Sequence, residues 1–225
     1  MHQDPPTIPR DQRLRITEIY ASVQGESTHV GKPCVFVRLT GCNLRCTWCD
    51  SAFTFHGGSW ASLDDVVERA GSYGIHTVEV TGGEPLLQPN APALMRRLLD
   101  AGHEVLLETS GSRDISPVPP EVRIILDLKP PDSGEVHANL WSNVERLAPK
   151  DEVKFVLASR RDYEWARDVT REHRLHERCG AVLLSPAWGL VDPKDLVEWM
   201  LADRLPARLQ LQLHKVVWPP DARGV

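Results

Sequence analysis

The sequence lacks any hydrophobic run close to the ~20 residues that a membrane-spanning helix needs. Its proline-rich start, MHQDPPTIPR, does not resemble a signal peptide. The net charge of −5 gives no chain-wide attraction to nucleic acid or to an anionic membrane surface. These absences favour a cytoplasmic protein that binds neither nucleic acid nor membranes. The shares of hydrophobic residues, 41%, and charged residues, 25%, are typical of a globular domain with a buried core.

The chain also lacks the paired cysteines of a disulfide-stabilised protein. It has five cysteines, an odd number, and Cys42, Cys46 and Cys49 lie within eight residues in the stretch GCNLRCTWCD. This clustering favours reduced thiols that bind a metal. Cys34 lies inside a predicted strand and Cys179 lies far along the chain, so we expect both to be packed thiols rather than ligands.

The C-x₃-C-x₂-C spacing offers no fourth cysteine nearby, and this absence separates several kinds of metal site. A zinc-stabilised binding module would pair two close ligands with two more elsewhere, and one of the nine histidines could complete such a site. A fully ligated electron-transfer cluster would need four thiolates. The spacing favours a [4Fe-4S] cluster held by three cysteines, in which one iron stays open to a small molecule.

Strand and helix patterns alternate along the chain after a loose tail at residues 1–12. Because such alternation produces parallel strands with right-handed crossovers, we predict an α/β fold. About six parallel strands are too few for a closed barrel, so we expect an open, partial β/α barrel that forms one domain over residues 13–225. Ser62 and Asp65 occupy the capping-box positions of the first helix. Strands are predicted at 14–26, 34–40, 76–85, 103–111, 122–129, 152–159, 181–186 and 208–218, and helices at 62–74, 90–102, 161–173 and 192–205.

Five segments with the chemistry of a site follow predicted strands: the cysteine loop, TGGEP, ETSG, DLKPP and LSPAWG. Sites in parallel α/β sheets form at the carboxyl ends of the strands, so we expect all five segments to meet on one rim. In TGGEP, Gly82 and Gly83 allow the backbone to approach a ligand closely, and Glu84 can accept a hydrogen bond from an ammonium group. The sequence therefore predicts one site.

The cysteine triplet, with Trp48 before its last cysteine, resembles the radical S-adenosylmethionine superfamily, and TGGEP resembles a second motif of that superfamily. The resemblance implies that S-adenosylmethionine chelates the open iron through its amino and carboxylate groups. It also implies that the reduced cluster cleaves a C–S bond to give a 5′-deoxyadenosyl radical, while the protein orients the reacting groups. A glycyl-radical activase shares the triplet and the small size, and it is the alternative enzyme.

Further motifs resemble the 7-carboxy-7-deazaguanine synthases over most of the chain: YASVQGES, FVRLTGCNLRC, CDSAFTF, LETSG, LKPP and QLHK. This resemblance implies a lyase that converts 6-carboxy-5,6,7,8-tetrahydropterin to 7-carboxy-7-deazaguanine with loss of ammonia, in queuosine and 7-deazapurine biosynthesis. It also implies catalytic use of S-adenosylmethionine, a requirement for Mg²⁺, a homodimer, and an electron donor that is flavodoxin-like or a chemical reductant. No catalytic side chain beyond the cluster and cofactor is implied. A tetrahydropterin assay would separate this enzyme from the activase.

Substrate-binding roles follow from the same resemblance. Arg38 lies four residues before Cys42, and its planar fork suits the substrate carboxylate, with a surface or dimer ion pair as the alternative. Val23, Gln24 and Gly25 match the segment that contacts substrate, where an amide and free backbone groups suit the donor–acceptor edge of a pterin. The remaining substrate candidates are Thr109 and the C-terminal Val225.

Metal and cofactor roles are implied in the same way. Ser51 matches a hydroxyl-bearing residue that binds Mg²⁺ beside the substrate, an ion that tolerates few protein ligands. Residues 127–129 stand where many relatives have Ser-Pro-Lys, and only the lysine is retained. The candidates for contact with S-adenosylmethionine are Trp48, Gly82, Gly83, Glu84, Gly111, Asp127, Leu128, Lys129 and Ser185. The histidines expected to be structural or solvated are His103, His137, His173, His176 and His214.

Overall fold

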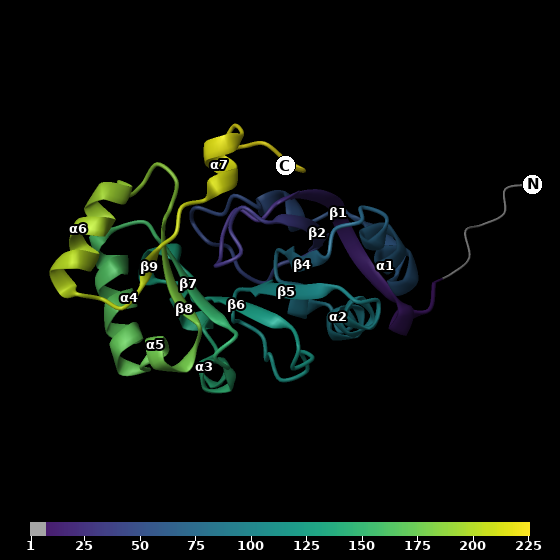
Figure 1. Ribbon diagram of the computed structural model, residues 1–225, viewed down its shortest axis with the longest axis horizontal. Helices are drawn as coiled ribbons and strands as arrows, with labels where there is room; N and C mark the ends of the chain where they lie inside the picture. Colours follow the sequence, from purple (N-terminus) through teal and green to yellow (C-terminus); the bar gives the residue numbers. More distant parts are fainter. Residues whose placement is uncertain (1–7) are drawn as a thin grey trace, which may run out of the picture.

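The computed structural model describes residues 8–225, so the first seven residues of the predicted tail lie outside the described part. Residues Arg10–Gln12 form a 3₁₀ turn, and Asn90 Nδ2 donates to Arg10 O at 2.7 Å, which attaches this end of the predicted tail to the domain. Within residues 8–225, nine strands form one sheet in the order β3-β1-β2-β4-β5-β6-β7-β8-β9 (Figure 1). The strands are β1 (Arg13–Val23), β2 (Pro33–Leu39), β3 (Ser59–Ser62), β4 (Thr77–Gly82), β5 (Glu104–Thr109), β6 (Arg123–Asp127), β7 (Glu152–Leu157), β8 (Ala181–Pro186) and β9 (Arg208–Leu209).

Most of the sheet is a parallel array. From β2 through β4 to β9, each strand is parallel to the next one in the sheet. At the other edge, β1 is antiparallel to β2 and β3 is antiparallel to β1. Six of the parallel strands have five residues or more, and β9 has only two. The prediction of an open barrel with about six parallel strands is therefore confirmed. The sequence pattern missed β3, a four-residue strand that pairs with β1.

Most helices lie along the outside of the sheet (Figure 1). At the start of α1, Ser62 Oγ accepts from Asp65 N at 3.0 Å and Asp65 Oδ2 accepts from Ser62 N at 3.3 Å, which confirms the predicted capping box. No helix in the described part of the chain is long and apolar enough to span a membrane. The helices are α1 (Leu63–Gly71), α2 (Ala91–Asp100), α3 (Ser142–Arg146), α4 (Arg160–Glu172), α5 (Leu175–Arg178), α6 (Pro193–Asp203) and α7 (Leu213–Val217).

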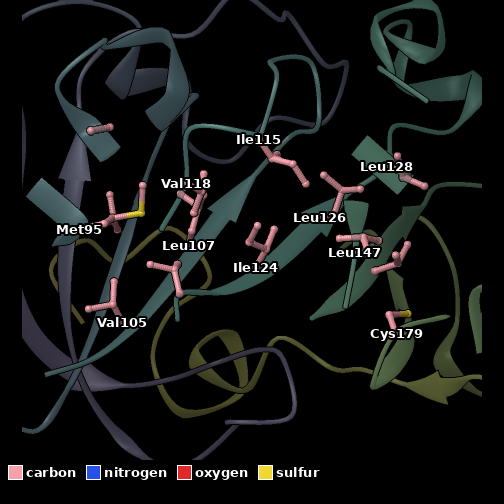
Figure 2. Close-up of a cluster of buried hydrophobic side chains, with 14 of the residues drawn as sticks. Met95, Val105, Leu107, Ile115, Val118, Ile124, Leu126, Leu128, Leu147 and Cys179 are labelled. Atoms are coloured by element: carbon pink, nitrogen blue, oxygen red, sulfur yellow. The ribbon is translucent and has the colours of Figure 1, made fainter. Parts of the chain in front are cut away.

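Side chains of the strands alternate between a hydrophobic core and a cavity. Figure 2 shows part of the core, where Val105 and Leu107 of β5 lie near Ile124 and Leu126 of β6. Successive side chains of a strand point to opposite faces, so Glu108 faces away from this core. The outer face of the sheet therefore binds the helices, and the inner face is free to carry charged groups.

The C-terminal segment differs from the prediction. RLQLQLHKVVW alternates like a strand, but only Arg208–Leu209 joins the sheet, and Leu213–Val217 forms α7. The chain leaves the sheet because its backbone finds another partner, since Leu213 N donates to Gly25 O at 2.9 Å. This contact with a segment far away in the sequence overrides the local pattern. It brings the last residues of the protein over the inner face of the sheet.

Candidate active site

A cavity of about 560 Å³ lies at the carboxyl ends of the parallel strands. The cysteine loop after β2 and the loops after β4, β5, β6 and β8 all contribute to its wall, which is the rim that the sequence predicts. Four predicted site residues, Glu84, Gly111, Leu128 and Ser185, are absent from the wall. The predicted site residues that line the cavity are Val23, Gln24, Gly25, Arg38, Cys42, Cys46, Trp48, Cys49, Ser51, Gly82, Gly83, Thr109, Asp127, Lys129 and Val225.

The three clustered cysteines have free, partly exposed thiols at one end of this cavity. Among the described residues, no three His, Cys, Asp or Glu side chains are grouped closely enough to hold a single metal ion. Burial raises the pKa of each of the three thiols, that of Cys46 to about 11, so binding of a metal would release protons. Three thiols set around a shared space fit a multi-iron cluster better than a zinc ion. Cys34 and Cys179 are buried, as predicted.

The two glycines of TGGEP pack directly against the cysteine loop. A Cβ atom on Gly83 would lie 2.5 Å from Gly41 O and 2.6 Å from the Cβ atom of Cys42. A Cβ atom on Gly82 would lie 2.4 Å from Leu39 O. At both positions these distances are too short for any side chain. Glycine is therefore required here to seat the cysteine loop, in addition to any close approach of a ligand.

Glu84 lies behind this cradle and is fully buried. Its carboxylate accepts hydrogen bonds from Leu86 N at 2.9 Å, Thr109 Oγ1 at 2.9 Å, and Ser110 N and Oγ at 2.8 and 2.6 Å. The sequence suggests that this carboxylate accepts a hydrogen bond from an ammonium group, and in the structure it accepts hydrogen bonds from groups of the protein. The Glu84 carboxylate joins the loop after β4 to the loop after β5. The Thr109 hydroxyl is one of its donors.

Two residues that the sequence gives as cofactor candidates carry a buried oxygen atom without a hydrogen-bond partner in the described part of the chain: Asp127 Oδ1 and Ser185 Oγ. The other carboxylate oxygen, Asp127 Oδ2, lies 2.9 Å from Lys129 Nζ. Burial lowers the pKa of Lys129, but the charges of Asp127 and Cys46 outweigh burial and raise it above the ordinary value. Unsatisfied buried acceptors cost stability unless a ligand supplies a donor. Asp127 lines the cavity, so its free oxygen fits a contact with a bound cofactor, whereas Ser185 is fully buried and does not reach the cavity wall.

Leu128 and Gly111 serve the fold instead. The side chain of Leu128 is fully buried in the hydrophobic core (Figure 2), so it presents no atom of its side chain to the cavity. Gly111 has φ +72°, and a Cβ atom there would lie 3.0 Å from Leu126 Cδ1. Its carbonyl accepts from Asn143 Nδ2 at 3.1 Å. The cofactor contacts implied for these two residues therefore have no side-chain basis in the structure.

Arg38 lines the cavity from β2 and is already paired. Its Nε atom donates to Glu18 Oε1 at 2.7 Å, and its Nη2 atom donates to Tyr20 Oη at 2.9 Å. Tyr20 in turn stacks on Phe36, with ring centroids 5.1 Å apart. The ion pair that the sequence analysis gives as the alternative is thus present, but it lies on the cavity wall. It holds the guanidinium in place without removing it from the cavity.

The segment around Gln24 and Gly25 offers fewer free backbone groups than the sequence suggests. Gln24 N donates to Lys32 O at 2.8 Å, and Gly25 O accepts from Leu213 N. A Cβ atom on Gly25 would lie 2.2 Å from His214 Nδ1, so the close approach of α7 requires glycine at this position. His214 lines the cavity, and burial lowers its pKa.

Four charged residues of the cavity wall were not predicted from the sequence: Glu26, Glu79, Glu108 and Lys154. We call this group the charged floor. Lys154 Nζ donates to Glu26 Oε2 at 2.6 Å and to Glu108, and it lies 3.6 Å from Asp127 Oδ2. Glu79 and Lys154 are 2% and 3% exposed. Buried charges of this kind are rare outside functional sites. The available signal was a charged residue at an inward position of an otherwise apolar strand.

The C-terminal segment forms the side of the cavity opposite the strands. Gln212 Nε2 donates to Glu26 Oε1 at 2.9 Å, and Lys215 Nζ donates to Asp50 Oδ2 at 2.6 Å. Burial raises the pKa of Asp50, but Lys215 and the hydroxyl of Ser51 outweigh burial and lower it to about 2. Ser51 Oγ donates to Asp50 Oδ1 at 3.0 Å. The helix α7 is therefore bound both to the charged floor and to the cysteine loop.

Trp48 and Val225 lie on this same wall. The guanidinium of Arg223 lies 4.2 Å from the centre of the Phe53 ring, a cation–π contact that holds the last residues of the chain against the loop after the cysteines. The C-terminus thus lies where the sequence analysis places it, at the cavity.

Comparison with known proteins agrees with this geometry. The model of the radical SAM superfamily matches residues 36–172, so the cysteine loop and the cradle beside it belong to a radical S-adenosylmethionine enzyme with a [4Fe-4S] cluster. Within that class, the chain belongs to the 7-carboxy-7-deazaguanine synthase family. This membership sets aside the zinc-stabilised binding module and the glycyl-radical activase.

Three relatives illustrate the similarity. The chain is 47% identical over 228 residues to the 7-carboxy-7-deazaguanine synthase of Koribacter versatilis, which covers 94% of this chain and 100% of that protein. It is 43% identical to the synthase of Chlorobaculum tepidum, over 94% of this chain and 97% of that protein. The crystal structure of QueE from Escherichia coli superposes with a TM-score of 0.74 at 25% identity, over 89% of this chain and 94% of the other.

Proposed function

We propose that this enzyme converts 6-carboxy-5,6,7,8-tetrahydropterin to 7-carboxy-7-deazaguanine with release of ammonia, a radical-mediated ring contraction in queuosine and 7-deazapurine biosynthesis. The observation that carries the proposal is a single cavity lined both by the three cysteines and by the charged floor. A cofactor and a small polar substrate would thus meet in the same space. The similarity to named synthases over almost the whole chain supports the same reaction.

The cofactor end of the cavity would be held by residues of four loops. Cys42, Cys46 and Cys49 would ligate three irons of the cluster, and S-adenosylmethionine would complete it. The bound cluster and S-adenosylmethionine supply the radical chemistry. The backbone at Gly82–Gly83 would pack against the cosubstrate, and the free oxygen of Asp127 would accept one of its donors.

The substrate end would be held by the charged floor and the wall of β2. Arg38 would bind the substrate carboxylate, because Glu18 and Tyr20 fix its planar fork in advance. Gln24 and Glu26 would face the donor–acceptor edge of the pterin. The hydroxyl of Ser51 would be a ligand of Mg²⁺, which accepts few protein oxygens and takes others from substrate and water.

We further propose a cytoplasmic homodimer that receives its electron from a flavodoxin-like protein. The edge strand β3 supports the dimer, because an exposed sheet edge needs to be covered. In the described part of the chain no strand pairs with its outer side, and its Trp60 is 53% exposed. Size-exclusion chromatography with light scattering would test the dimer separately from the reaction.

The experiment that tests the function is anaerobic purification and cluster reconstitution, followed by a turnover assay with S-adenosylmethionine, Mg²⁺, reductant and the carboxytetrahydropterin. We expect product from the wild-type enzyme, none from Cys46→Ala, and a kcat/KM about 30- to 100-fold lower for Arg38→Ala, because a charged bidentate contact is lost. Cleavage of S-adenosylmethionine without product would keep the superfamily and reject the substrate. A protein that binds zinc and no cluster would reject both.

A further inference from the structure

Glu79 of β4 is a buried carboxyl group without a cation of its own. It is 2% exposed, and its Oε2 atom accepts a hydrogen bond from Gln24 Nε2. In the described part of the chain no ion pair includes it, because Lys154 and Arg38, the cations nearby, are paired with other carboxylates. Its contact with Gln24 is thus its defining interaction.

The surroundings of Glu79 favour the neutral acid. Burial raises its pKa well above the ordinary value, and the carboxylates of Glu108 and Glu26 add to this effect, whereas Lys154 and Arg38 oppose it. A carboxylate at this position would be a further negative charge near Lys154, which already faces Glu26, Glu108 and Asp127, and it would have no counter-ion of its own. The titratable and charged groups that face Glu79 are Tyr20 of β1, Glu26 of the loop between β1 and β2, Cys34 and Arg38 of β2, Glu108 of β5 and Lys154 of β7.

The amide of Gln24 is held at both ends by groups of opposite kind. Its Nε2 atom donates to Glu79, and its Oε1 atom accepts from Glu26 N at 3.0 Å. An amide can rotate by half a turn with almost no change of shape, so only its partners decide which end faces which. The backbone N–H of Glu26 can only donate, so it takes the amide oxygen, and Glu79 accepts from the nitrogen at the other end. The side chain of Glu26 in turn accepts hydrogen bonds from Lys154 and Gln212.

We propose that Glu79 is a positioning residue of the substrate site, which accepts from the Gln24 amide and, together with the N–H of Glu26, holds that amide in one orientation. In doing so it fixes the donor and acceptor pattern that the floor of the cavity presents to the aminopyrimidine ring of a pterin. This inference rests on the proposed function, because a pterin substrate is what the pattern would bind. Glu79 itself acts through Gln24 and touches no reacting atom.

The test compares Glu79→Gln and Glu79→Leu with the wild-type enzyme by steady-state kinetics across pH. Gln imitates a neutral acid in shape and can accept from Gln24, so we expect a KM within about twofold of wild type. Leu removes the acceptor, so we expect KM for the pterin to rise about tenfold with a smaller change in kcat. In the wild type, KM rises as pH increases through the raised pKa of Glu79, and Glu79→Gln abolishes this rise.

The matched control is Glu104→Gln, on β5 of the same sheet. Glu104 does not line the cavity and lies 3.3 Å from Arg123, so its substitution should leave the KM and its pH profile unchanged. If Glu79→Leu does not fold, Glu79→Asp replaces it, because the shorter side chain withdraws the acceptor from Gln24. Infrared difference spectra of wild type against Glu79→Gln provide a second measurement, in which we expect the C=O band of a protonated carboxyl group to be missing from the variant.

Two results would overturn the inference. A wild-type KM in both Glu79→Leu and Glu79→Asp would show that Gln24 needs no partner. A tenfold rise in KM for Glu79→Gln, with no lost infrared band, would show that Glu79 acts as a carboxylate. Failure of the wild-type enzyme to convert the pterin is a different outcome, since it would reject the proposed function before any variant is compared.

Discussion

Lys215 Nζ lies 2.6 Å from Asp50 Oδ2, and this ion pair joins helix α7 to the residue that follows the last clustered cysteine. The two residues are separated by 165 positions in the sequence. The side chain of Lys215 is 8% exposed, whereas that of Asp50 is 47% exposed, so water reaches one partner only. The pair is therefore one of the contacts that hold the C-terminal segment over the cavity, and its energetic value is that of a partly screened contact.

Replacement of Lys215 by methionine should weaken substrate binding more than folding. The substitution removes the bond to Asp50 and keeps most of the apolar stem, so we expect the free energy of unfolding to fall by about 1 kcal/mol or less. We expect KM for the pterin to rise about tenfold, because the segment that covers the cavity is released. Urea denaturation and steady-state kinetics would measure both. Lys194→Met, which breaks an exposed pair with Glu198, is the control, and equal KM values in the two variants would contradict the prediction.

Replacement of Gly83 by alanine should impair cluster assembly. The added Cβ would lie 2.5 Å from Gly41 O and 2.6 Å from Cys42 Cβ, so the cysteine loop must shift, at a cost of about 1–3 kcal/mol. We expect less iron per chain after reconstitution, measured by iron analysis and by the visible absorption of the cluster. Gly71→Ala is the control, because a Cβ there meets only His103 Nε2 at 3.9 Å. A full complement of iron in Gly83→Ala would contradict this account.

The parallel part of the fold could be predicted from the sequence because each inner strand has a local cause. β-branched and leucine-rich runs such as VRIILDLK end in turn residues, and helices such as α1 begin with a capping box. The end of the chain could not be predicted in this way. Residues 208–218 alternate like a strand, but the bonds of Leu213 to Gly25 and of Lys215 to Asp50 draw them out of the sheet. Contacts between distant segments decide such a stretch, and no local pattern records them.

The residues of the site also differ in whether the sequence predicts them. The cysteines and glycines could be predicted, because C-x₃-C-x₂-C and TGGEP carry their chemistry in adjacent residues. The charged floor was missed, because Glu79, Glu108 and Lys154 come from three different strands that are otherwise rich in apolar residues, and no local pattern joins them. The ammonium partner predicted for Glu84 rests on a carboxylate after two glycines, and the local pattern does not show that this carboxylate also accepts hydrogen bonds from the loop after β5.

Replacement of Lys154 by methionine should strongly destabilise the protein. Lys154 is 3% exposed and is the cation shared by Glu26 and Glu108, so its removal leaves buried carboxylates without compensation. Breaking a buried ion pair by removing one partner costs about 3–5 kcal/mol. We expect the double variant Lys154→Met/Glu108→Gln to recover part of this loss, since one uncompensated charge is removed as well. Urea denaturation would measure both, and a loss below about 1 kcal/mol in the single variant would contradict the prediction.

The raised pKa of Glu79 makes a prediction about stability as well as about substrate binding. Between the unfolded value of about 4.3 and the higher folded value, the folded protein holds a proton that the unfolded chain has released. This residue's contribution to the free energy of unfolding therefore falls as pH rises through that window, by at most about 1.4 kcal/mol per pH unit, and is level again above the folded value. Glu79→Gln cannot titrate, so its stability relative to wild type should increase with pH across the window. Urea denaturation of both proteins from about pH 5 to about pH 8 would measure the difference, with Glu104→Gln as the control, and a constant difference would mean that Glu79 is ionised in the folded protein throughout.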